Sequence, residues 1–239
     1  MATFVLVHGG GHGGWCYQRV ARLLRAAGHD VYTPTLTGLG ERAHLLRADI
    51  DLDFHIGDIV KVLHFDDLRD VILVGHSYGG MVITGVADRA TDRVGKLVFL
   101  DAATPKNGES LVDHAGPVIN AVRPYGQVVD GIELVLLPGP DAGRLYGVED
   151  PDDLAWMADR LTGHPWQCFE QKLVLCNEDA LRAIPDFHVV CTSTIRTRER
   201  TIMERARAAG RLWDVDTGHD LMITAPTAVA AALLEIANA

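Results

Sequence analysis

Ser77 is the residue whose surroundings in the sequence point most clearly to chemistry. It lies in the pentapeptide Gly75–Gly79, Gly-His-Ser-Tyr-Gly, directly after the apolar run Val71–Val74. A buried strand, a sharp turn and a helix start place a nucleophilic serine on a strained elbow, where glycines avoid steric collision. Gly-x-Ser-x-Gly also arises by chance in glycine-rich chains, so the prediction depends on the strand before it and the helix pattern after it.

A serine nucleophile needs a base, and the base needs a carboxylate that orients it. His219 is the best candidate among the eleven histidines, because it follows the last predicted strand, Leu212–Val215. Asp101 ends the predicted strand that follows the nucleophile helix, so it returns to the same edge of the sheet one strand over. We therefore predict a triad of Ser77, His219 and Asp101. The alternative for Asp101 is a turn cap without a catalytic role.

The first predicted strand, Thr3–Val7, runs into His8-Gly9-Gly10-Gly11-His12. A loop of this kind supplies the second oxyanion-hole donor in many hydrolases, so we expect the backbone N–H groups of Gly10 and Tyr78 to bind the oxyanion. His8 and His12 are expected to fix the loop by hydrogen bonds. The alternative is a dinucleotide-binding loop, but the spacing does not match Gly-x-Gly-x-x-Gly followed by an acidic residue after the second strand.

Composition narrows the class of protein. The 239 residues carry a net charge of −10 without a basic cluster, which disfavours nucleic acid and anionic membranes as partners. No apolar run approaches the ~18 residues of a membrane span, and no signal-peptide pattern is seen, so a cytoplasmic location is expected. The four cysteines lack Cys-x-x-Cys spacing, which predicts reduced thiols and no metal site. A homodimer is compatible with the sequence.

Strands alternate with helices along most of the chain, which predicts an α/β fold with a mostly parallel sheet of about six strands covered by helices on both faces. We expect one domain over residues 1–239. The predicted strands are Thr3–Val7, Asp30–Tyr32, Val71–Val74, Lys96–Leu100, Phe187–Cys191 and Leu212–Val215, and the predicted helices are Arg19–Ala27, Phe54–Leu63, Met81–Ala90, Arg198–Ala209 and Pro226–Ala237.

Residues 105–185 lose this alternation and gain prolines, which predicts a helical cap inserted into the domain, with one helix over Leu154–Leu161. The cap contains large apolar side chains that could line a substrate pocket or fill its core. As substrate-binding candidates we name Tyr125, Trp156, Met157 and Trp166. They favour an apolar or aromatic acyl or alcohol group.

The chain resembles an α/β-hydrolase of the branch that includes plant methyl-ester esterases, hydroxynitrile lyases and small bacterial carboxylesterases. The resemblance covers nearly the whole chain and rests on Phe4–Gly9, His12–Trp15, Ala27–His29, Val71–Met81, Val98–Leu100 and Gly218-His219. It implies the α/β-hydrolase fold and a serine esterase mechanism. The family places its acid after Cys-Thr, where this chain has Ser193-Thr194. Haloalkane dehalogenases and zearalenone lactonases carry the acid one strand after the nucleophile helix, which supports Asp101.

The resemblance also allows other activities of the fold to be compared with the residues of this chain. The lyases of the branch need a threonine where this chain has Gly9 and a lysine where it has Asp220, and a dehalogenase would need an aspartate at Ser77. Cofactor-free dioxygenases share the fold and the triad and remain an alternative, as do a hydroxynitrile-lyase-like lyase on the same fold and a non-catalytic small-molecule binder. A binder would be expected to lose a triad residue. We predict a serine hydrolase without a cofactor that cleaves a carboxylic ester or lactone of a small to medium apolar or aromatic substrate through an acyl-enzyme.

Overall fold

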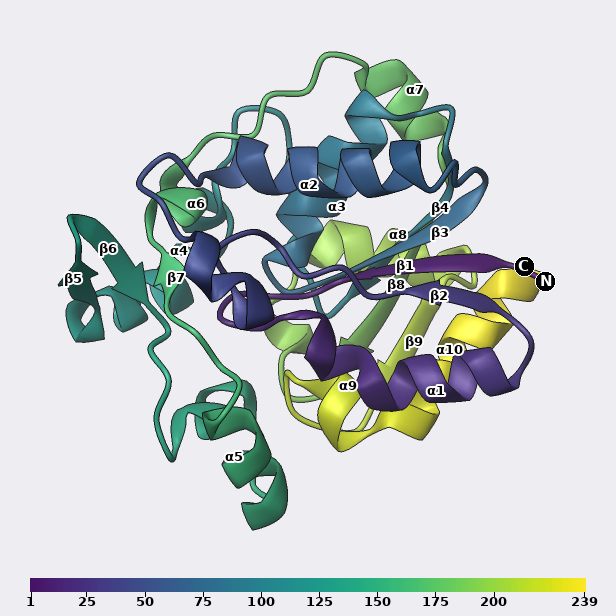
Figure 1. Ribbon diagram of the computed structural model, residues 1–239. Coiled ribbons are helices and arrows are strands. Elements are labelled where there is room, and N and C mark those ends of the chain that lie inside the picture. Colours follow the sequence, from purple (N-terminus) through teal and green to yellow (C-terminus); the bar gives the residue numbers. More distant parts are fainter.

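The computed structural model describes residues 1–239 except the side chain of Thr197. Its centre is a six-stranded sheet in the order β2-β1-β3-β4-β8-β9, in which every neighbouring pair is parallel (Figure 1). The strands are β1 (Thr3–Val7), β2 (Asp30–Tyr32), β3 (Val71–His76), β4 (Val94–Leu100), β8 (Asp186–Cys191) and β9 (Leu212–Val215). The six predicted strands are therefore all present, and the largest boundary change is two residues.

Helices cover both faces of this sheet (Figure 1). One face carries α1 (Gln18–Ala26), α9 (Leu221–Thr224) and α10 (Pro226–Asn238); the other carries α2 (Leu52–Phe65), α3 (Gly79–Arg89) and α7 (Glu178–Ala183). Helix α8 (Arg200–Ala208) packs against β8 and β9. Among the described residues, no helix is both long and apolar enough to cross a membrane.

Two hydrophobic cores follow from the side-chain alternation of the strands. In β1, Val5 and Val7 pack with α2 and α3, whereas Phe4 and Leu6 pack with α1 and α10. Local signals agree with this arrangement. Helix α2 begins two residues before its predicted start, because the side chain of Asp51 accepts the N–H of Phe54 as an N-cap.

The insertion between β4 and β8, up to α6, lies at the carboxyl ends of the strands, away from the two termini (Figure 1). It is not purely helical, because β5 (Gln127–Val129), β6 (Ile132–Val135) and β7 (His164–Pro165) form a small antiparallel sheet. Its other elements are α4 (Leu111–Val122), η3 (Arg123–Tyr125), η4 (Ala142–Tyr146), α5 (Pro151–Ala158) and α6 (Gln167–Glu170). Asp130-Gly131, both with positive φ, turns β5 into β6, and Asp-Gly is a known hairpin signal.

The predicted helix Leu154–Leu161 is displaced toward the N-terminus. Helix α5 spans Pro151–Ala158, because Asp150 caps the N–H groups of the first turn and Pro151 suits the first helical position. The cap residue and the proline, rather than the apolar spacing, decide where this helix begins.

Candidate active site

The turn from β3 into α3 has the geometry of a nucleophile elbow. Ser77 has φ of 53°, in the left-handed region, which is a strained conformation for a residue with a side chain. The flanking glycines are required by close backbone contacts. A Cβ at Gly75 would lie 2.6 Å from the carbonyl oxygen of Gly79, and a Cβ at Gly79 would lie 2.7 Å from that of Val7.

The three residues of the predicted triad are brought together. Ser77 Oγ lies 2.9 Å from Nε2 of His219, and Nδ1 of His219 lies 2.5 Å from Oδ2 of Asp101. Asp101 ends β4, His219 follows β9, and the two are 118 residues apart in the chain. A base placed between a hydroxyl and a carboxylate in this order can take the hydroxyl proton and hold the positive charge that follows.

Asp101 is fully buried, and its two carboxylate oxygens are surrounded by donors. Oδ1 accepts the hydroxyl of Thr194 at 2.6 Å, and Oδ2 lies 2.7 Å from the guanidinium of Arg198. The backbone N–H and thiol of Cys191 complete the set. Burial alone would raise the pKa of Asp101, but the hydrogen bond with His219 and the charge of Arg198 lower it well below its ordinary range. Asp101 is therefore ionised.

The same contacts act on His219. Burial favours the neutral imidazole, but the hydrogen bond with Asp101 and the negative charge of that carboxylate outweigh it and raise the pKa of His219 to about 9. The carboxylate of Asp220 adds to this increase. The imidazolium that forms when the base takes a proton is thus stabilised by its surroundings.

The glycine loop after β1 is fixed by buried histidines. His8 Nε2 accepts the N–H of Leu36 at 3.0 Å, so its proton is on Nδ1, which donates to the carbonyl oxygen of Gly9 at 2.8 Å. Burial lowers the pKa of His8 to about 3, which keeps the ring neutral. Nδ1 of His12 donates to the carbonyl oxygen of Gly10 at 2.7 Å. These contacts agree with the loop-fixing roles predicted for both histidines.

The two predicted oxyanion donors belong to the elbow and to the glycine loop. Tyr78 directly follows Ser77, and Gly10 carries the N–H of the peptide whose carbonyl oxygen His8 binds. Within the described part of the chain, neither N–H has an acceptor in the protein. Both donors are therefore available to a substrate oxygen, and their catalytic role stays a prediction.

Sequence reasoning missed several residues that hold the triad. His76 donates Nε2–H to the backbone carbonyl of His219 at 3.0 Å, and the fully buried Asp220 lies 2.8 Å from Nε2 of His12. Thr194 and Arg198 were also missed as partners of Asp101. The positions of His76, directly before the predicted nucleophile, and of Asp220, directly after the predicted base, were the signals available in the sequence.

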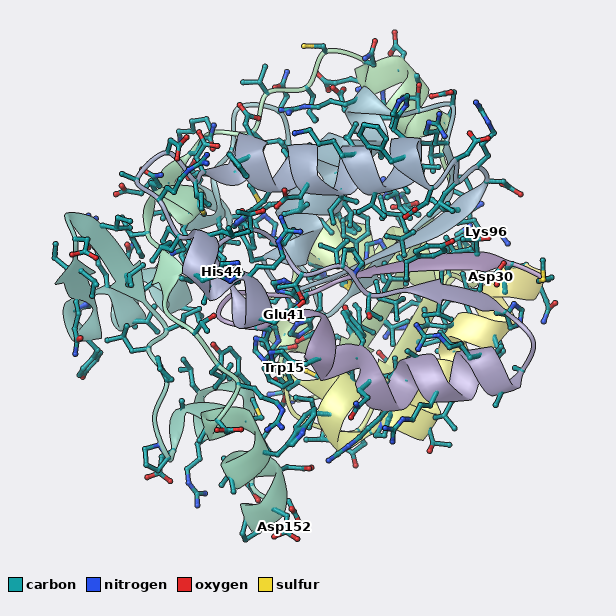
Figure 2. The ribbon with its side chains drawn as sticks, viewed as in Figure 1. Trp15, Asp30, Glu41, His44, Lys96 and Asp152 are labelled. Carbon is teal, nitrogen blue, oxygen red and sulfur yellow. The ribbon has the colours of Figure 1, made fainter. Side chains whose placement is uncertain are left out.

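The four predicted substrate-binding residues lie in different surroundings. Tyr125 on η3 is 81% exposed, whereas Trp166 and Met157 are buried in hydrophobic cores. Trp156 packs edge-on against Trp15, the residue that Figure 2 labels on the side of the body facing α5. The contacts of Trp166, Met157 and Trp156 are packing contacts, so their part in substrate binding stays a prediction.

Two other apolar side chains lie nearer to the oxyanion loop. A Cβ built on Gly10 would meet Leu136 at 2.7 Å and Phe169 at 3.1 Å. Leu136 follows β6 with φ of 53°, and Phe169 belongs to α6. The sequence offered no signal for either residue, because both reach the loop only through the fold of the cap.

The described side chains contain one cluster with the residue types of a metal site, formed by His55, His164 and Cys168. Both ring nitrogens of His55 have hydrogen-bond partners, the hydroxyl of Tyr78 and the carbonyl oxygen of Thr37. Nδ1 of His164 accepts the N–H of Gly11, which leaves the proton on Nε2, and this buried nitrogen has no partner among the described residues.

Comparison with known proteins identifies the family. The model of the alpha/beta hydrolase family matches residues 4–232. The chain belongs to this family. A methylesterase from Arabidopsis, with a TM-score of 0.75 and 24% identity over 100% of this chain and 99% of that one, shows the same fold. The predicted α/β-hydrolase fold is confirmed.

Two curated relatives show what the chain is similar to within the family. It is 58% identical to the carbendazim hydrolyzing esterase of Nocardioides sp. over 112 residues, which is 47% of this chain and 46% of that protein. It is 29% identical to the salicylic acid-binding protein 2 of Nicotiana tabacum over 265 aligned positions, 98% of this chain and 96% of that protein. The predicted resemblance to plant methyl-ester esterases and bacterial carboxylesterases is confirmed.

Proposed function

We propose that this protein is a serine carboxylesterase that cleaves its substrate through an acyl-enzyme. The observation that supports this most strongly is the continuous chain of contacts from Ser77 Oγ to His219 at 2.9 Å and from His219 to Asp101 at 2.5 Å. Membership of the esterase branch is consistent with it.

The proposed mechanism uses only these side chains and the backbone. His219 takes the proton of Ser77 as Oγ attacks the ester carbonyl, and the N–H groups of Gly10 and Tyr78 bind the oxyanion. The imidazolium, stabilised by Asp101, then protonates the leaving alcohol. Water attacks the acyl-enzyme in a second cycle of the same steps and releases the acid.

For the substrate we propose a carboxylic ester or lactone of a small to medium apolar or aromatic compound. The two apolar side chains above Gly10, Leu136 and Phe169, favour such a group near the oxyanion loop. One relative is named for hydrolysing carbendazim and another for binding salicylic acid, which supports a small organic molecule.

Ser77→Ala is the test of the mechanism. We expect the variant to keep its fold and to hydrolyse p-nitrophenyl esters, methyl esters or lactones at less than about a thousandth of the parental rate. An organophosphonate should label the parent at Ser77 and leave the variant unlabelled. The matched control is Ser110→Ala, because Ser110 caps α4 and should affect stability only. A folded Ser77→Ala enzyme with near-parental turnover contradicts the proposal.

Two of the alternatives, the cofactor-free dioxygenase and the non-catalytic binder, predict different results in the same assay. An esterase turns its substrate over equally fast with and without oxygen, whereas a cofactor-free dioxygenase needs oxygen and consumes it. A non-catalytic binder would hold the ester without releasing the alcohol. Turnover that occurs only in air would therefore show that the protein is an oxygenase and not an esterase.

A further inference from the structure

Arg198 contacts both the side chain and the backbone of Asp101. Its Nη2 lies 2.7 Å from Oδ2 of Asp101 and 2.8 Å from the carbonyl oxygen of the same residue. Nη1 donates to the carbonyl oxygen of Ala102 at 3.3 Å. The side chain is only 16% exposed, so these contacts lie largely out of water, where hydrogen bonds to charged groups are strong.

Asp101 has two features that require such a partner. Its φ of 45° lies in the left-handed region, which is strained for an aspartate and must be held by surrounding contacts. Its carboxylate is fully buried, and a buried charge is stable only when it is paired. Arg198 supplies both the backbone contacts and the permanent positive charge.

The end of β8 and the segment after it surround this carboxylate with hydrogen-bond donors. They provide three donors: the hydroxyl of Thr194, the N–H of Cys191 and the guanidinium of Arg198. The guanidinium and Nδ1 of His219 share the same oxygen, Oδ2, which connects Arg198 directly to the hydrogen bond of the base.

We propose that Arg198 is a positioning residue that holds Asp101 against His219 and limits how strongly the carboxylate stabilises the imidazolium. The inference rests on the proposed function and adds to it a residue that does not touch the substrate. The charged and titratable groups that face His219 or its acid are Asp101, Arg198, Asp220, Cys191, His76 and Tyr146, whose ring stacks on that of His219. Arg198 is the one permanent cation in this set.

The test compares Arg198→Met and Arg198→Lys with the parent, using p-nitrophenyl ester hydrolysis between pH 6 and 11, with spontaneous hydrolysis subtracted. In Arg198→Met the carboxylate no longer shares its charge with a guanidinium, so the imidazolium is stabilised more. We expect the acid limb of kcat/KM to move up by about one pH unit and kcat at its plateau to fall about 10- to 100-fold. KM should change little, because Arg198 does not contact the substrate.

Arg198→Lys keeps the charge but lacks the fork that reaches both Oδ2 and the backbone. We expect its acid limb to stay at the parental pH while kcat falls, and this variant decides the inference if Arg198→Met does not fold by circular dichroism. The control is Arg200→Met, an exposed arginine of the same segment that pairs with Glu204.

The outcomes separate the inference from the proposed function. A folded Arg198→Met enzyme with parental kcat, or with an acid limb that stays in place or moves down, overturns the role of Arg198. A parental kcat in Arg198→Lys would show that the forked contact of the guanidinium is not needed, and it also overturns the inference. If Ser77→Ala keeps its activity, the serine mechanism itself is wrong, whatever the arginine variants show.

Discussion

His8 Nδ1 lies 2.8 Å from the carbonyl oxygen of Gly9, and this contact orients the peptide plane that carries the N–H of Gly10. In a trans peptide the N–H points away from the C=O, so a histidine that binds the oxygen on one side aims the N–H on the other. The second ring nitrogen is held by the N–H of Leu36. The ring therefore sets the direction of a proposed oxyanion donor without touching the substrate.

His8→Leu should disturb this donor. We expect kcat to fall about 100-fold with a small change in KM, because loss of one oxyanion donor typically costs that much. Stability should fall by about 2–4 kcal/mol, since the Gly9 carbonyl and the Leu36 N–H lose their partner. His29→Leu is the control, because His29 also accepts a backbone N–H but lies at the opposite end of β1. Parental kcat in folded His8→Leu would show that the loop holds its shape without the ring.

Asp101→Asn tests the acid. We expect kcat to fall by about two to four orders of magnitude, because an amide stabilises the wrong imidazole tautomer and cannot balance the imidazolium. Asp214→Asn and Asp216→Asn should retain nearly parental activity, because these residues bind Arg207 and Thr192 at the surface. Steady-state kinetics on the three variants decides the matter. A large loss of kcat in either control, with activity kept in Asp101→Asn, would show that the acid of the triad lies on or after the last strand.

Much of this arrangement can be predicted from the sequence because it depends on strand ends. Ser77 and Asp101 directly follow β3 and β4, His219 lies shortly after β9, and parallel strands bring their carboxyl ends to one edge. The partners Thr194 and Arg198 could not be predicted, because they depend on how the segment after β8 folds back over β4. The part of the cap that was missed is the hairpin β5-β6, whose short strands carry too little apolar pattern to be recognised.

Substrate residues were the hardest to predict. A large apolar side chain in a cap serves the core and a pocket equally well in sequence, and Trp166 and Met157 turn out to be buried. Leu136 reaches the oxyanion loop through a residue conformation with positive φ, which nothing in its sequence neighbourhood indicates.

Activity and stability should respond to pH in opposite directions through His219. Its pKa in the folded protein is raised to about 9, and only the neutral ring acts as a base. We therefore expect kcat/KM to rise with pH up to about 9. Because the folded pKa exceeds the unfolded value of 6.5, the stability that His219 contributes is full below pH 6.5 and is lost as pH rises toward 9. Rate profiles and urea unfolding measured over pH 6–10 test both trends, and an acid limb below pH 7 would contradict this assignment.

The buried neutral histidines should make the fold sensitive to acid. Burial lowers the pKa of His8 and of His76 to about 3 and also lowers the pKa of His55 and His164. The unfolded chain binds protons at these rings below pH 6.5 while the folded one does not, so stability is present above pH 6.5 and is lost as pH falls. Each ring contributes up to about 1.4 kcal/mol per pH unit.

Urea unfolding at pH 4.5, 5.5 and 6.5 measures this slope. We expect the free energy of unfolding to fall steeply toward pH 4.5, by more than one histidine alone could produce. The exposed His64→Gln variant should show the parental slope. A free energy of unfolding that stays constant between pH 6.5 and 4.5 would mean that these rings titrate alike in both states.

Gly80 should tolerate no side chain, because the segment that carries Asp101 crosses it. A Cβ at Gly80 would lie 2.0 Å from the carbonyl oxygen of Ala103, and the N–H of Ala103 in turn donates to the carbonyl oxygen of Ser77 at 3.0 Å. Gly80→Ala must push β4 and α3 apart where nucleophile and acid meet. We expect a loss of about 3 kcal/mol or more in the free energy of unfolding, with activity lost as well.

Gly57→Ala is the matched control for this substitution. Gly57 lies in α2 with no atom within 4 Å of its added Cβ, so the change only removes backbone freedom from the unfolded chain and favours the helix. It should raise the free energy of unfolding by about 0.5–1 kcal/mol and leave kcat unchanged. Urea denaturation and ester hydrolysis on both variants separate the two effects. Equal stability of the two variants would show that α3 and the segment after β4 do not approach as closely as the contact at Gly80 requires.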